Sequence, residues 1–92
     1  MPSQKKITIW DVNANRIAEI SENLLRAMQS VGSRYDLEIM SEPPLISRMG
    51  LLDRLPSFEV DGMYWTLKPG ETVTQKEAEQ LIRILDRQEA NA

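Results

Sequence analysis

The chain has 92 residues, a formal net charge of −3 and neither cysteine nor histidine. The missing side chains exclude disulfides, thiolate nucleophiles, an imidazole general base and zinc sites of the usual ligand types. The length fits one domain near the small end of what folds alone, and 41% hydrophobic with 27% charged residues is ordinary for a globular protein. We therefore expect a single domain over residues 1–92, with frayed ends at 1–5 and 88–92 and no cofactor.

Charge and hydropathy patterns narrow the class of partner. The 11 basic residues are scattered and form no stripe that would follow a phosphate backbone, so nucleic acid is not an expected partner. No apolar run approaches the roughly 18 residues of a membrane span, and no apolar segment of a signal peptide follows Lys5-Lys6. We expect a cytoplasmic protein without a membrane anchor.

The first half of the chain has the pattern of a strand, a helix and a second strand. Residues 6–10 form a short alternating segment rich in β-branched and aromatic side chains. Asn13 is suited to cap the next helix and Gly32 to end it. The apolar stripe between them consists of Ile17, Ile20, Leu24, Met28 and Val31. Residues 35–40 alternate again with their apolar side chains inward, which predicts a parallel strand pair with a right-handed crossover.

The second half begins with a short helix opened by Pro43-Pro44. Residues 58–60 and 63–67 then flank Asp61-Gly62, a dipeptide typical of two-residue hairpins with positive φ at both positions. A capping box at Thr74–Glu77 starts a final helix. Its apolar stripe consists of Ala78, Leu81, Ile82 and Leu85. The predicted order is β-α-β-α-β-β-α, an α/β fold.

The segment Leu55-Pro56-Ser57-Phe58-Glu59-Val60-Asp61-Gly62 has the apolar-Pro-x-apolar-x-Val-Asp-Gly pattern of a cis-proline that leads into a hairpin. With the element order, it resembles the small thioredoxin-like and glutaredoxin-like proteins called redox-active disulfide proteins. The resemblance covers nearly the whole chain, and this segment is its most specific part. It implies a thioredoxin-like fold, in which a four-stranded mixed sheet has helices on both faces.

Members of that family carry a Cys-x-x-Cys pair after the first strand, where this chain has residues 11–15 and then a helix. Ala14 and Ile17 fall near the two cysteine positions. Disulfide exchange has no first step without a sulfur nucleophile, so thiol–disulfide oxidoreductase activity is excluded and an enzyme is the less favoured hypothesis. In the family, the residue before the proline pairs through its backbone with an extended peptide or glutathione. The resemblance therefore implies a ligand-binding edge formed by Trp10, Asp11, Asn13, Ala14, Asn15, Leu55, Pro56 and Ser57.

The favoured hypothesis is a redox-inactive thioredoxin-like module that binds a protein or extended peptide, as an accessory or scaffold subunit. The alternative is a small-molecule binder or a non-thiol enzyme that uses the same edge. Exposed amides at the start of the first helix would then favour glutathione, a carboxylate or another anion.

A calcium loop is a further alternative for the segment that follows the first strand. Five residues have the required spacing, namely Asp11, Asn13, Asn15, Glu19 and Glu22. Arg16 stands where the loop needs a glycine, so we favour a capped helix start. Glu59 also leaves two hypotheses open, because a buried carboxylate is either a tuned acid or one that reaches the rim or a basic partner.

Overall fold

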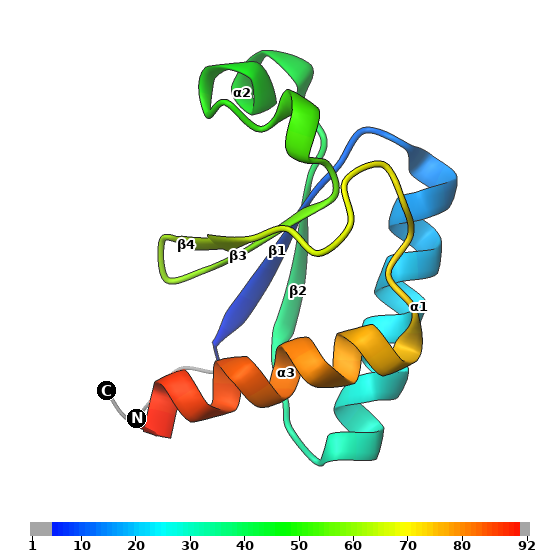
Figure 1. The fold of residues 1–92 in the computed structure, drawn as a ribbon, viewed down its shortest axis with the longest axis vertical. Coiled ribbons are helices and arrows are strands. Elements are labelled where there is room, and N and C mark those ends of the chain that lie inside the picture. Colours follow the sequence, from blue (N-terminus) through cyan, green and yellow to red (C-terminus); the bar gives the residue numbers. More distant parts are fainter. Residues whose placement is uncertain (1–4, 91–92) are drawn as a thin grey trace.

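The computed structural model describes residues 5–90, which form a four-stranded mixed sheet with three α-helices (Figure 1). In chain order the elements are β1 (Lys6–Trp10), α1 (Ala14–Val31), β2 (Asp36–Met40), α2 (Pro43–Arg48), a short 3-10 helix η1 (Leu52–Arg54), β3 (Ser57–Val60), β4 (Met63–Trp65) and α3 (Gln75–Ala90). The strand order is β2-β1-β3-β4, with β1 parallel to β2 and antiparallel to β3. The expected α/β class and four-stranded mixed sheet are confirmed.

Local sequence signals set the ends of the long helices. The Asn13 side chain accepts a hydrogen bond from the Arg16 amide at 3.0 Å, and Gly32 ends α1 with a φ of 82°. At the start of α3, the Thr74 amide donates to Glu77 Oε1 at 3.0 Å and the Glu77 amide donates to Thr74 Oγ1 at 3.2 Å. α3 then stays helical through Ala90, whereas we expected fraying from residue 88. The other residues expected to fray, apart from Lys5, are 1–4 and 91–92 and lie outside the described range.

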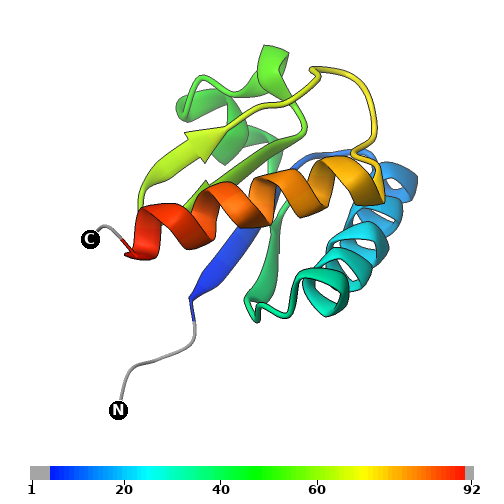
Figure 2. The ribbon, with the colours of Figure 1, turned by 60° about the horizontal axis from the view of Figure 1, so that its bottom comes forward.

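The main core lies between one face of the sheet and the helices α1 and α3. Side chains alternate along a strand, so Ile7 and Ile9 point to the same face. Figure 2 shows α1 and α3 side by side over this face, and the two helices pack directly against each other. The buried residues of the main core are Ile7, Ile9, Ile20, Leu24, Ala27, Met28, Tyr35, Phe58, Val60, Val73, Ala78, Leu81, Ile82 and Leu85.

A smaller core lies at the upper end of the sheet, where β1 and β2 end and β3 begins (Figure 1). Trp10, which alternates with Ile9, packs there against Ile46 of α2 and against Leu51 and Leu55. α2 has six residues and packs mainly against η1, so it covers only the upper end of this second face. Helices therefore lie on both faces of the sheet, but the lower part of the α2 face is open.

Two features differ from the expectation for the edges of the sheet. β2 is an edge strand, and its Ile39, expected to point inward, is 49% exposed. β4 ends at Trp65 rather than at residue 67, because the chain then turns away toward Gly70. Within residues 5–90, no helix combines the length and the apolar character needed to cross a membrane.

Candidate functional site

The predicted site residues come from two segments that meet at the upper end of the sheet. Trp10 and Ser57 are paired across the antiparallel strands β1 and β3, so the residues after Trp10 and those before Ser57 share one edge. α1 starts at Ala14, close behind β1. The structure thus brings segments 10–15 and 55–57 together.

The two segments contribute little exposed surface of their own. Trp10 and Asp11 are buried, and so is the whole segment 55–57. Only residues 13–15, at the start of α1, are exposed among the predicted site residues. The edge is therefore a closed framework with an exposed helix start beside it.

The main-chain edge at Leu55 is partly occupied by the protein itself. The Leu55–Pro56 peptide bond is cis. The Leu55 carbonyl accepts a hydrogen bond from the Gly70 amide at 2.7 Å. Ser57 Oγ donates to the Arg54 carbonyl at 2.7 Å and lies 2.9 Å from Thr66 Oγ1. These contacts support the loop internally and leave less main chain for an extended peptide than the resemblance implies.

A buried ion pair holds the start of α1 against the end of β1. The Asp11 side chain is fully buried and that of Arg16 is 18% exposed. Arg16 Nε donates to Asp11 Oδ2 at 2.6 Å and Nη2 donates to Oδ1 at 2.5 Å, a bidentate arrangement. Asp11 Oδ1 also accepts from the Val12 amide at 2.8 Å. The hydrogen bond to Asp11 is the main cause that raises the pKa of the Arg16 guanidinium, so the pair stays charged.

These contacts argue against the calcium alternative. Asp11 is committed to Arg16, and α1 is already helical at Ala14. Glu22 pairs with Arg26 on the surface of α1 instead of turning back toward Asp11. In the part of the chain that the structure describes, no group of three or more acidic residues is arranged to hold a metal ion.

Sequence analysis missed a second cluster, on the α2 face of the sheet. Glu59 is half-buried and accepts a hydrogen bond from Trp10 Nε1 at 2.9 Å. The rings of Trp10 and Tyr64 meet edge to face with centroids 6.1 Å apart. Glu59 thus reaches a neutral indole instead of a basic partner. The strand register, which places Glu59 opposite both Thr8 and Tyr64, is the signal that finds this cluster, and the sequence does not supply it.

Three apolar side chains are exposed on loops around the upper end. Val12, before α1, is 48% exposed; Met49, after α2, is 46% exposed; and Leu52, at the start of η1, is 57% exposed. Apolar groups gathered on neighbouring loops are typical of a protein-contact surface. We call these three residues the apolar rim.

Two hollows lie away from the upper end. One of about 660 Å³ lies where α1 ends and β2 begins, and is lined by residues between Leu25 and Asp36. A smaller one of about 160 Å³ lies between the β3–β4 hairpin and α3. Neither is lined by a predicted site residue.

Comparison with known proteins gives no relative for this chain. No family model matches it, and neither a curated protein nor a solved structure does.

Proposed function

We propose that the protein is a redox-inactive thioredoxin-like module that binds a partner protein at the upper end of its sheet. The observation that carries the proposal is the apolar rim of Val12, Met49 and Leu52, exposed around a framework whose own polar groups are paired. The kinship with thioredoxin-like proteins is supported by the element order and by the position of the α1 start beside segment 55–57.

The contacts at the upper end favour binding over chemistry. Asp11 is held by Arg16, and the Ser57 hydroxyl is bound to the Arg54 carbonyl, so neither side chain is poised as a base or nucleophile. The chain also has no cysteine. A binding module needs none of these groups, because exposed apolar side chains on a rigid support supply its affinity.

The same contacts favour a folded partner over an extended peptide. A peptide strand would need the Leu55 carbonyl, which the Gly70 amide already occupies at 2.7 Å. A convex rim of apolar side chains instead fits a hollow on another protein. The glutathione alternative is weaker for a similar reason, since both hollows described above lie elsewhere.

Site-specific photo-crosslinking tests this proposal. A photoreactive phenylalanine analogue is placed at position 12 or 52, with position 63 as a matched control, because Met63 is 51% exposed in the distant hairpin. We expect positions 12 and 52 to crosslink the same protein and position 63 not to. With that protein purified, Val12→Asp and Leu52→Asp should each weaken binding about tenfold, measured by calorimetry. Equal crosslinking from all three positions, or an affinity that neither variant changes, would contradict the proposal.

Two further assays separate the alternatives. Turnover in an insulin-reduction assay would contradict redox inactivity. Glutathione titrated into ¹⁵N-labelled protein should leave the amide signals unchanged. Shifts clustered at residues 11–16 and 55–57 would favour the small-molecule alternative instead.

A further inference from the structure

The lower part of the α2 face carries polar and aromatic side chains that no helix covers. Strand register and alternation place six of them there, and we call this set the open face: Lys6, Thr8, Trp10, Glu38, Glu59 and Tyr64. Lys6 Nζ lies 2.8 Å from Glu38 Oε2, so these two charges are paired. Glu59, at the centre of the open face, is the remaining charge.

Glu59 is a half-buried carboxylate without a cationic partner. Its Oε1 accepts from the neutral Trp10 indole at 2.9 Å. In the described part of the chain, no lysine or arginine nitrogen lies within 4.0 Å of its oxygens. The field of this charge reaches its neighbours: after burial, it raises the pKa of Tyr64, and after Glu38, it contributes to the raised pKa of Lys6. A partly desolvated charge of this kind is stabilised by a cation from outside.

Two aromatic rings flank this carboxylate. Tyr64 stands directly opposite Glu59 across β3 and β4 and is 37% exposed. Trp10 lies diagonally from Glu59, and its ring meets that of Tyr64 edge to face. An exposed ring beside a carboxylate attracts a cation both through the ring quadrupole and through direct charge. The hydrogen bond from Trp10 already orients Glu59, so binding does not have to order that side chain.

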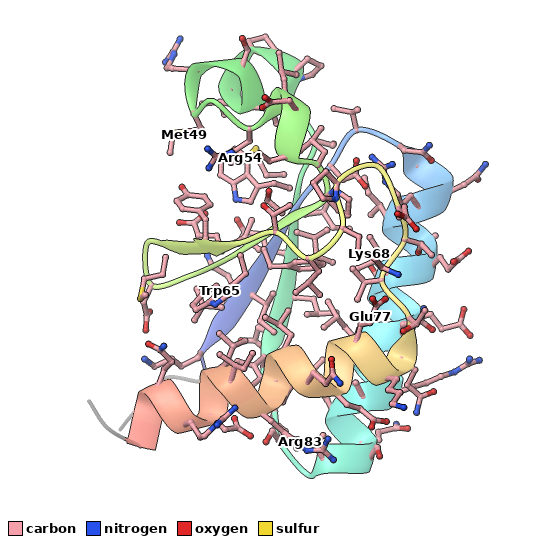
Figure 3. All side chains as sticks on the ribbon, in the orientation of Figure 1. Met49, Arg54, Trp65, Lys68, Glu77 and Arg83 are labelled. Atoms are coloured by element: carbon pink, nitrogen blue, oxygen red, sulfur yellow. The ribbon has the colours of Figure 1, made fainter. Side chains whose placement is uncertain are left out.

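We propose that the open face binds one lysine or arginine side chain of a partner protein, between Tyr64 and Glu59. Positive charges at both ends of the face limit the site to a single cation. Lys6 lies at the lower end of β1, and Arg54 projects at the upper end, near Met49 (Figure 3). A run of basic residues would meet one of these charges, whereas an isolated basic side chain would not. The inference does not rest on the apolar rim.

The two tryptophans give this site an internal reporter. Trp10 belongs to the open face, whereas Trp65 alternates with Tyr64 and packs against the main core. The probe is the peptide acetyl-Gly-Arg-Gly-amide, and its neutral control carries citrulline in place of arginine. In ¹H–¹⁵N spectra, we expect the arginine peptide to shift the Trp10 indole N–H signal to saturation and to leave that of Trp65 unchanged. Equal shifts of both indoles, or equal effects of the two peptides, would overturn the proposal.

Substitutions at Glu59 and Tyr64 sharpen the test. Glu59→Gln keeps an oxygen that accepts from Trp10 but removes the charge, and should weaken binding of the arginine peptide by about fivefold or more. Tyr64→Ser should weaken it about threefold, whereas Tyr64→Phe, which keeps the ring, should not. The matched control is Glu71→Gln, which removes an exposed carboxylate before α3.

An affinity that Glu59→Gln leaves at the wild-type value would overturn the proposal. Should that variant fail to fold, the comparison of Tyr64→Ser with Tyr64→Phe decides, and equal affinities would overturn it. Since the probe is a small peptide, these outcomes are independent of whether a partner binds the apolar rim.

Discussion

The main core and the small core at the upper end are held by different amounts of structure. In the main core, α1 and α3 both pack on strands from the middle of the sheet. The small core of Trp10, Ile46, Leu51 and Leu55 is closed by a six-residue helix and η1. Losing a contact in the first loosens every long element, whereas losing one in the second frees only α2 and η1. The comparison indicates that stability resides in the main core, and that the proposed partner surface lies on the less stable end.

The largest effect should come from a charge placed in the main core. Leu24 is fully buried, so Leu24→Asp leaves an unpaired carboxylate among apolar side chains, and we expect it to abolish cooperative unfolding. The matched control is Leu25→Asp, because Leu25 is 53% exposed one position along the same helix. Thermal melts by circular dichroism check both variants. A Leu24→Asp protein that melts within a few degrees of wild type would contradict the assignment of the core.

A somewhat smaller loss is expected from breaking the buried pair at the start of α1. Arg16→Met leaves the fully buried Asp11 without its cation and should lower the free energy of unfolding by about 3 kcal/mol. The double variant Asp11→Asn with Arg16→Met removes both charges and should recover part of this loss. Urea denaturation measures both. A double variant less stable than Arg16→Met would show that the pair is not a compensated charge pair.

A local effect is expected at the small core. Ile46 is the fully buried anchor of α2, and Ile46→Ala should cost about 2 kcal/mol. The comparison of the two cores predicts that this loss is confined to α2 and η1. Hydrogen exchange should therefore speed up in residues 43–54 while protection in α1 and α3 stays near its wild-type level. Uniform loss of protection would mean that the two cores unfold as one unit.

The smallest effect concerns the charge at the start of α3. The Thr74 amide, followed by Lys68, whose Nζ lies 2.9 Å from Glu77 Oε2, lowers the pKa of Glu77 in the folded protein (Figure 3). A lowered folded-state pKa adds stability that is complete above the ordinary glutamate value of 4.5 and is lost as the pH falls through the folded-state value. Glu77→Gln should thus be less stable than wild type by about 1 kcal/mol or less at pH 7. The difference should vanish near pH 3; a constant difference from pH 7 to 3 would show that charge is not its cause.

For the candidate site, sequence analysis predicted which segments matter more accurately than what they do. The register of β1 and β3 brings segments 10–15 and 55–57 together, as the expected site requires. Their closure was not predictable, because it depends on Gly70 and Arg16, whose partners become clear only once the loops are placed. The cluster of Trp10, Glu59 and Tyr64 was missed for the same reason, since three separate strands contribute to it.

Sequence alone determined the elements of this protein and many of their ends. The cap at Asn13, the capping box at Thr74–Glu77 and the positive φ angles of Asp61 and Gly62 each depend on residues within one turn of the chain, so local chemistry suffices. Tertiary structure decided what is covered. α2 is too short to reach beyond the upper end of its face, so Glu59 and Tyr64 stay accessible there, while Leu55 is closed by a distant loop. Exposure depends on which elements pack over a residue, and no pattern of neighbours along the chain contains that information.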